Sequence, residues 1–265
     1  MVTDEDLPKK SLGQHWLSDV SVLESIVDMA EVSALDTILE IGPGPGTLTD
    51  VLLYRAARVV AVEFDASLAA ELSERLAHES RLEVYNEDIR RYDLTKLPKG
   101  YKVVANIPYY LSSYLVRLLS MTKNPPETVV LLIQQEVAQR LAAKPGKLSL
   151  LGVTAQSFWD IELGLVVAPE MFFPPPKVNS QVVKLSRKRH PAFDPTMERD
   201  FLQAVRIGFS QKRKTLINGL SGGYHIQKTD AKAIVESIGL AASVRPQELS
   251  VLDWVKLTKA LIPKQ

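Results

Sequence analysis

Short apolar runs alternate with helical patterns over the first two-thirds of the chain. Five runs rich in β-branched residues predict buried strands. They cover Thr37–Ile41, Arg58–Glu63, Leu82–Tyr85, Lys102–Ala105 and Thr128–Ile133. Because helical patterns separate the strands, we expect an α/β fold in which a mostly parallel sheet has helices on both faces.

The helices are indicated where apolar residues recur every three or four positions. Ser18 or Asp19 can cap the first helix, whose apolar face is formed by Val22, Leu23, Ile26, Val27 and Ala30. A later stripe combines Leu111, Tyr114, Leu115, Leu118 and Leu119, and another helix is expected over Glu136–Ala142. Two further strands, Phe158–Val167 and Gln181–Leu185, are expected to complete a seven-stranded sheet in antiparallel orientation.

The last part of the chain shows helical patterns only. They cover Met197–Phe209, Lys214–Leu220, Asp230–Ile238 and Leu252–Leu261. Residues 187–195 are basic and contain two prolines, which is typical of a linker. We therefore expect a Rossmann-like domain in residues 1–186, a linker in 187–195 and a small all-helical domain in 196–265.

Composition favours a reducing compartment. The chain contains no Cys, which excludes disulfides and Cys-based metal sites. Its first residues contain no apolar stretch typical of a secretory signal, and no apolar run approaches the ~18 residues of a membrane helix. We expect a cytoplasmic protein without a membrane partner.

The net charge of +1 hides an uneven distribution of charges. From Lys184 onward there are 15 Lys and Arg against 7 Asp and Glu, whereas the preceding residues have 17 against 24. Two acid-free clusters contribute: Lys184, Arg187, Lys188 and Arg189, and then Arg206, Lys212, Arg213 and Lys214. These clusters suit phosphates, and a solvated basic face is the alternative interpretation.

Three polar features stand at the ends of successive predicted strands, where open parallel sheets bind ligands. A glycine loop, Glu40–Gly46, follows the first strand and lets the backbone approach a ligand closely. Glu63 ends the second strand, where a carboxylate can accept both hydroxyls of a ribose. Asp88 follows the third strand and can accept from an adenine amine. Together the three features indicate a site for an adenosine-type nucleoside.

A nicotinamide cofactor is the competing interpretation of this site. The glycines, however, follow the spacing G-x-G-x-G with prolines between them, which is not the dinucleotide fingerprint. No candidate hydride-transfer residue is evident either. An oxidoreductase is therefore disfavoured.

The fourth strand ends in Asn106-Ile107-Pro108-Tyr109, which suggests a specific reaction. The exocyclic amine of adenine is a poor nucleophile because its lone pair is delocalised into the ring. The Asn106 side-chain oxygen and the Ile107 carbonyl can accept hydrogen bonds from both amine hydrogens, which frees the nitrogen lone pair. Pro108 keeps the turn rigid. Tyr109 offers a ring on which a flipped base can stack. S-adenosylmethionine (SAM) is the methyl donor that such a site predicts.

Over most of its length, the chain resembles the ribosomal RNA adenine dimethyltransferases of the KsgA type. The matching segments are Lys10–Leu17, Glu40–Thr49, Glu63, Asp88, Asn106–Tyr109, Phe172–Val183 and Phe209–Lys214. The resemblance implies a SAM-dependent methyltransferase sheet in residues 1–186 and a helical, RNA-contacting domain in 196–265. It further implies dimethylation of two neighbouring adenines in the 3′-terminal hairpin loop of small-subunit rRNA, within a pre-30S-type particle.

The same resemblance assigns roles to individual residues. It implies that SAM contacts His15, Leu17, Gly42, Glu63, Asp88 and Asn106. It also implies that Phe172 is a second ring, which sandwiches the target adenine against Tyr109. No metal is expected, because the four His residues lie far apart in the sequence, and a monomer is the default expectation.

A few positions depart from the family pattern. Trp16 stands where Phe is usual, Tyr110 where Asn is common, and Asn179 where Asp is usual. Leu148-Ser149 replaces a pair that is generally Tyr-Gly. None of these residues is a proposed contact of SAM or of the amine.

Two other functions remain open at this level. A relative that methylates one adenine in large-subunit rRNA and confers resistance to macrolide-type antibiotics would share both sites. Alternatively, the protein is a ribosome-assembly factor whose binding role outweighs its methylation. Assays on separated subunits and on a catalytically inactive variant distinguish these possibilities.

Overall fold

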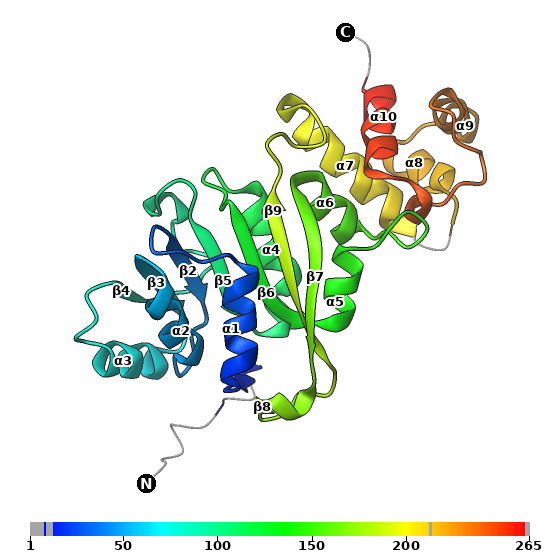
Figure 1. Ribbon diagram of the computed structural model, residues 1–265. Helices are drawn as coiled ribbons and strands as arrows, with labels where there is room; N and C mark the ends of the chain where they lie inside the picture. The colour runs from blue at the N-terminus through cyan, green and yellow to red at the C-terminus, as the bar shows by residue number, and fades with distance from the viewer. Residues whose placement is uncertain (1–7, 9–12, 212–213, 263–265) are drawn as a thin grey trace. The chain divides into compact units, whose positions relative to one another are not determined.

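Seven strands form one sheet in the order β4-β3-β2-β5-β6-β9-β7 in a computed structural model that describes residues 8, 13–211 and 214–262. The strands are β2 (Thr37–Ile41), β3 (Arg58–Glu63), β4 (Leu82–Asn86), β5 (Lys102–Asn106), β6 (Thr128–Gln134), β7 (Trp159–Val167) and β9 (Ser180–Arg187). The pairs formed by β2, β3, β4, β5 and β6 are parallel, and β9 pairs antiparallel with β6 (Figure 1). The expected mostly parallel, seven-stranded sheet is thus confirmed.

The carboxyl ends of β4, β3, β2 and β5 meet at one edge of the sheet. Glu63 at the end of β3 pairs in register with Asn86 at the end of β4. Ile41 at the end of β2 pairs with Val62, which precedes Glu63. Parallel strands with this register bring the glycine loop, the β3 carboxylate and the β5 turn together at the same edge.

Helices α1 (Val20–Met29) and α2 (Thr47–Arg55) cover one face of the sheet (Figure 1). Asp19 caps α1 by accepting from the Val22 backbone N–H at 3.1 Å, which identifies the cap between the two expected candidates. The apolar side of both helices packs on alternate strand residues, including Ile38, Val104 and Val130. Burial of these aliphatic side chains is the main contribution to stability in this layer.

The remaining helices that follow strands in this part of the chain are α3 (Ala66–Arg75), α4 (Ser112–Met121) and α5 (Gln135–Leu141). A short 3₁₀ turn, η4 (Tyr109–Leu111), leads from the β5 turn into α4. Leu115, Val116 and Leu119 form the buried side of α4. The apolar stripe expected there was partly wrong, because Tyr114 is exposed rather than buried.

The residues that follow the sheet form a group of helices. They are α7 (Glu198–Gly208), α8 (Leu216–Tyr224), α9 (Lys228–Ser237) and α10 (Val251–Leu261). Trp254 is fully buried among them and stacks on Phe209 with ring centroids 5.5 Å apart. Gly208 makes this packing possible, because a Cβ there would lie 2.3 Å from the Trp254 ring. The expected helical C-terminal part is confirmed.

Helix α6 (Leu150–Phe158) was not expected from the sequence. Its N-cap is Ser149, whose side chain accepts from the Gly152 N–H at 3.1 Å. Leu148 is buried just before the cap. The Leu148-Ser149 departure from the family pattern therefore begins a helix here.

Two compact units can be distinguished by their internal contacts. One consists of the described residues up to Ala138 together with Ile161–Arg187, and the other of Gln139–Asp160 with the described residues from Lys188 onward. The second unit thus includes a segment that lies inside the range 1–186. The functional division at residues 186 and 196 stays a prediction. Within the described ranges, every helix is too short or too polar to cross a bilayer.

Candidate active site

The glycine loop between β2 and α2 is shaped by its backbone conformation. Gly42, Gly44 and Gly46 all have positive φ, at 67°, 58° and 87°. Side chains rarely tolerate this conformation, and the prolines between the glycines stiffen the loop. At Gly44, an added Cβ would also lie 3.3 Å from the Trp16 indole nitrogen. The loop can therefore hold the backbone close to a bound ligand.

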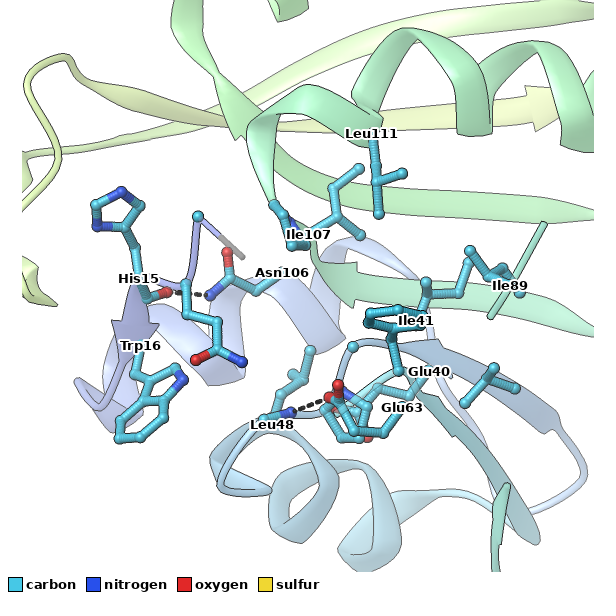
Figure 2. A pocket seen from close by; sticks show the side chains of 18 of the residues that line it. His15, Trp16, Glu40, Ile41, Leu48, Glu63, Ile89, Asn106, Ile107 and Leu111 are labelled. Atoms are coloured by element: carbon cyan, nitrogen blue, oxygen red, sulfur yellow. Dashed lines mark hydrogen bonds between the residues drawn. The ribbon is translucent and has the colours of Figure 1, made fainter. Parts of the chain in front are cut away.

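Glu63 lies beneath this loop at the end of β3. Its carboxylate accepts the Gly44 N–H at 3.1 Å (Figure 2). It also accepts the Asp65 N–H at 2.8 Å. Burial raises the pKa of the carboxyl group, and the two backbone N–H donors counteract part of that shift. The side chain is thus held in place with oxygen lone pairs left for a ribose.

Glu40 is a second, fully buried carboxyl group in the same cavity. Burial raises its pKa to about 8, although Thr49 donates its hydroxyl to Glu40 at 2.7 Å. The negative charge of nearby Glu63 acts in the same direction as burial. Glu40 is therefore largely protonated at neutral pH in the ligand-free protein. The sequence motif contained Glu40 but did not show that it would be buried.

Asp88 follows β4 and is held by Arg90. The Arg90 backbone N–H donates to Oδ1 at 2.9 Å, and its side chain makes hydrogen bonds of 2.5–2.9 Å to both carboxylate oxygens. This hydrogen bonding, which Arg90 provides, lowers the pKa of Asp88. The ionised carboxylate can accept a further donor such as an aromatic amine. Sequence reasoning missed Arg90.

The segment before α1 closes one side of the cavity. It forms the two-residue strand β1 (Trp16–Leu17), which pairs antiparallel with β8 (Phe172–Phe173). Thr47, the first residue of α2 after the glycine loop, donates its hydroxyl to the Leu17 carbonyl at 2.8 Å. The His15 ring nitrogen Nδ1 lies 2.7 Å from the Pro174 carbonyl, so this nitrogen carries the proton.

Asn106 ends β5 with its carboxamide held in one orientation. Its Nδ2 donates to the His15 backbone carbonyl at 3.1 Å (Figure 2). Because a carbonyl can only accept, the amide nitrogen must be the atom that faces His15. The side-chain oxygen is therefore left as an acceptor for another group.

Tyr109 is fixed beside Asn106 by two contacts. Its hydroxyl lies 2.8 Å from the Ser180 hydroxyl, and one face of its ring stacks on His15 with centroids 5.6 Å apart. Burial raises the pKa of the phenol, so Tyr109 stays neutral at physiological pH. Its ring thus has a defined position in the site.

A single cavity brings most of the expected residues together. Its wall includes His15, Leu17, Gly42, Glu63, Asp88, Asn106, Pro108 and Tyr109. Figure 2 shows His15, Trp16 and Asn106 on one side of this cavity and Ile89 on the other. Other wall residues include Trp16, Glu40, Ile89 and Arg90. Within the described part of the chain, no three His, Asp or Glu side chains are grouped as metal ligands.

Trp16 offers a test of whether the cavity suits a polar ligand. Its indole nitrogen is buried and has no hydrogen-bond partner among the described residues. An unsatisfied buried donor costs roughly 1–3 kcal/mol. Together with the carboxylates of Glu63 and Asp88, this donor suits a ligand that carries hydroxyl, amine and carboxylate groups, which SAM does.

Phe172 does not line the cavity. Its side chain is 4% exposed and belongs to the core beneath α1 and α2, whereas the neighbouring Phe173 is 58% exposed. The pairing of β1 with β8 explains the difference, because Phe172 is opposite buried Leu17 and Phe173 is opposite Trp16. The expected stacking of a base on Phe172 would require this core residue to move.

The first basic cluster is largely used within the chain. Lys184 pairs with Glu31 at 2.5 Å, Arg187 donates to the Ser120 carbonyl at 3.1 Å, and Lys188 pairs with Asp160 at 3.0 Å. These contacts weaken the expectation that the cluster binds phosphates. In the second cluster, Arg206 and Lys214 are exposed. Lys212 and Arg213 lie outside the described residues, as do Lys10, Ser11 and Leu12 of the first matching segment.

The sheet and its cavity define a SAM-dependent methyltransferase. The glycine loop and the acidic residues at the ends of β3 and β4 surround a cavity with the donors and acceptors that SAM needs. Residues 6–262 match the family described as ribosomal RNA adenine dimethylase. The chain belongs to this family and is an rRNA adenine dimethyltransferase.

Similar proteins cover nearly the whole chain. A "Ribosomal RNA small subunit methyltransferase A" of Dehalococcoides mccartyi (strain CBDB1) is 37% identical over 257 residues, which span 94% of this chain and 87% of the relative. A protein of the same name from Bacillus mycoides (strain KBAB4) is 37% identical over 266 residues, which span 96% and 91%.

Two solved structures are similar over most of their lengths. A dimethyladenosine transferase from Plasmodium falciparum has a TM-score of 0.80 at 28% identity, covering 92% of this chain and 96% of that one. The 23S rRNA methyltransferase ErmE has a TM-score of 0.75 at 26% identity, covering 93% and 99%. The fold is therefore shared with a dimethyladenosine transferase and with a 23S rRNA methyltransferase.

Proposed function

We propose that this protein dimethylates the N6 amines of two adjacent adenines in the 3′-terminal hairpin loop of small-subunit rRNA. The support is the similarity, over more than nine-tenths of the chain, to relatives named as small-subunit enzymes. The proposed substrate is a pre-30S-type particle in the cytoplasm, and the proposed active form is a monomer. This places the reaction in ribosome biogenesis.

The observation that carries the chemical proposal is the fixed Asn106 carboxamide. With Nδ2 bound to the His15 carbonyl, the side-chain oxygen accepts one proton of the target amine. The Ile107 backbone carbonyl accepts the other, and Pro108 keeps both acceptors in place. Hydrogen bonds from both N–H groups to these acceptors shift the nitrogen toward a tetrahedral form with its lone pair free, while both protons stay on the nitrogen until the methyl group has been transferred. Such preorganised polar groups supply a large part of enzymatic rate enhancement.

The cofactor is proposed to lie along the cavity wall. Glu63 holds the ribose hydroxyls, Asp88 accepts from the adenine amine, and Gly42 allows close approach of the loop. His15, Leu17 and Asn106 line the end that receives the amino-acid portion. SAM supplies the electrophilic methyl group and its own leaving group when it is bound.

A strong general base is not needed in this proposal. The methylated amine is acidic enough to lose its extra proton to water. Tyr109, which remains neutral because burial raises the pKa of its hydroxyl, acts as a stacking surface for the target base. The face of its ring that is turned away from His15 is the one proposed to receive the base.

Large-subunit rRNA is the second candidate substrate, since the similar structure ErmE is a 23S rRNA methyltransferase. Separated small and large subunits from cells that lack both activities distinguish the candidates. The protein is incubated with each subunit and SAM, and the rRNA is digested and analysed by mass spectrometry. We expect dimethyladenosine in small-subunit rRNA at two adjacent positions. Methylation confined to the large subunit would overturn the proposal.

An assembly role that outweighs catalysis is tested in cells. The gene is deleted and complemented with either the wild-type protein or the Asn106→Ala variant. If the loss of methylation causes the defects in subunit assembly, the Asn106→Ala variant does not restore assembly. Full restoration by a variant that leaves the adenines unmethylated would show that binding is the principal function.

A further inference from the structure

Two large aromatic side chains next to the reaction turn are exposed to water. Tyr110 is 64% exposed and Tyr114 is 42% exposed. Tyr110 borders the cofactor cavity, and Tyr114 borders a separate surface groove. Neither ring contributes to the core, so the fold does not account for them.

The two tyrosines lie on one face of a continuous helical run. Tyr110 lies in η4 and Tyr114, four residues later, lies in α4. Arg117 lies three residues after Tyr114 in the same helix. This spacing places all three side chains on the same side of the run. Arg117 and Lys123 both line the groove beside Tyr114. Neither cation forms an ion pair with a carboxylate in the part of the chain that the structure describes.

Arg90 supplies a further cation on the cavity side. It lines the cavity and binds Asp88 there. Tyr110 lines the same cavity. Arg90 and Tyr110 therefore border the same space, while Tyr114 continues the same helical face into the groove. Arg90, Tyr110, Tyr114, Arg117 and Lys123 form an aromatic–basic track that runs from the cavity into the groove.

We propose that this aromatic–basic track binds the single-stranded RNA that flanks the target adenine, an inference that rests on the proposed function. A base that enters a catalytic pocket loses its stacking on both neighbours. Exposed tyrosine rings replace such stacking with little dependence on base identity, and the cations beside them neutralise the phosphates. The track starts at Tyr110, directly after the residues that hold the target amine. It therefore has the composition and the position to receive the adjoining nucleotides.

The charge of the track favours RNA over a protein partner. Arg90 is already paired with Asp88, but Arg117 and Lys123 pair with no carboxylate among the described residues. Asp93, the carboxylate in the groove, already caps a turn by accepting from Thr95. A polyanion neutralises this excess of positive charge. A protein partner is the competing occupant, and the experiment is designed to detect it.

Tyr114 is the residue that tests the track most cleanly, because it does not line the cofactor cavity. Binding of a labelled, short single-stranded RNA containing adenines is measured by fluorescence anisotropy for Tyr114→Ala and Tyr114→Phe. We expect the Ala variant to bind roughly 5- to 100-fold more weakly, the range for loss of one stacked base. The Phe variant keeps the ring and binds like the wild type. S-adenosylhomocysteine affinity, measured by calorimetry, stays unchanged in both variants.

Tyr54→Ala is the matched control, since Tyr54 is 89% exposed on α2 and lines neither the cavity nor the groove. This variant keeps the RNA affinity of the wild type. Arg117→Ala weakens binding and reduces the slope of log affinity against log salt by roughly one. A duplex of the same sequence is insensitive to Tyr114→Ala because its bases are already stacked.

Three results would overturn the inference. They are equal RNA affinities of the Tyr114→Ala and Tyr54→Ala variants, no binding of the single strand by the wild type, or a loss seen only on protein-containing subunits. The last result would assign the track to a protein. Failure of the proposed function is detected by a different measurement, the mass spectrometry of rRNA. In that case the wild-type protein would leave small-subunit rRNA without dimethyladenosine.

Discussion

The Asn106 side chain donates to the backbone carbonyl of His15 at 3.1 Å, across 91 positions in the sequence. This one hydrogen bond connects the reaction turn after β5 with the segment before α1. It also decides which end of the carboxamide is available for the target amine. The orientation of Asn106 therefore depends on the position of the N-terminal segment, which β8 and Thr47 at the start of α2 hold in place.

Replacement of Glu63 with Gln is expected to weaken cofactor binding. A neutral amide offers one acceptor oxygen instead of two charged ones, and hydrogen bonds to charged groups contribute about 1.5–3 kcal/mol. The affinity for S-adenosylhomocysteine should fall roughly 10- to 100-fold in calorimetric titrations. Glu83→Gln is the control, because Glu83 lies on the neighbouring strand β4 and binds Arg58 instead. Equal affinities of the two variants would contradict the role of Glu63.

Cofactor binding is expected to change the fluorescence of Trp16. Of the three Trp residues, Trp159 and Trp254 are fully buried, whereas Trp16 lines the cavity with an unpartnered indole N–H among the described residues. A titration with S-adenosylhomocysteine should therefore alter the emission of the wild type but not that of Trp16→Phe. The matched control is Trp254→Phe, since the Trp254 indole N–H also lacks a partner among the described residues. A full change in fluorescence emission in the Trp16→Phe variant would contradict the position of Trp16 in the cofactor site.

The protonation of Glu40 makes stability depend on pH. Burial raises the pKa of Glu40 from 4.5 to about 8 in the folded protein. Between these values the folded state holds a proton that the unfolded state releases, so this contribution to stability is complete below pH 4.5 and is lost as pH rises through 8. Each unit of pKa shift corresponds to about 1.4 kcal/mol, so the loss amounts to a few kcal/mol.

Glu40→Gln tests this dependence, because the amide oxygen still accepts from Thr49 and carries no titratable proton. Urea unfolding at pH 5.5 and 8.5 should show a smaller loss of stability in the variant than in the wild type. Glu79→Gln is the control, since the hydrogen bond from Arg81 lowers the pKa of Glu79 and keeps it ionised over this range. Parallel pH dependences of wild type and Glu40→Gln would refute the assignment.

The sequence predicted the strands of the sheet well, because the pattern that indicates a buried strand lies within a few consecutive residues. Buried, β-branched runs such as Thr37–Ile41 and Arg58–Glu63 match β2 and β3 residue for residue. The polar residues after these runs were also expected at one edge, since parallel strands share their carboxyl ends. Helix α6 was missed because its core-facing residues do not form a clear stripe against a polar face.

Features that depend on tertiary contacts were harder to predict. Tyr114 fits an apolar helical stripe, yet the face of α4 that packs on the sheet excludes it. Phe172 matches a family position, yet the two-residue pairing with Leu17 directs it into the core. The partners of Lys184 and Lys188 lie far along the chain or on another strand, so spacing in the basic cluster did not reveal them.

The central claim concerns Asn106, and the most direct measurement is the rate of a single methyl transfer at saturating cofactor and substrate. Asn106→Ala should slow this step by roughly 10²–10³-fold, as expected when one oriented polar group is removed, while particle binding stays close to that of the wild type. Asn124→Ala is the control, because its amide also donates to backbone carbonyls but lies outside the cavity. An Asn106→Ala variant that transfers methyl groups as fast as the Asn124→Ala control would contradict the account.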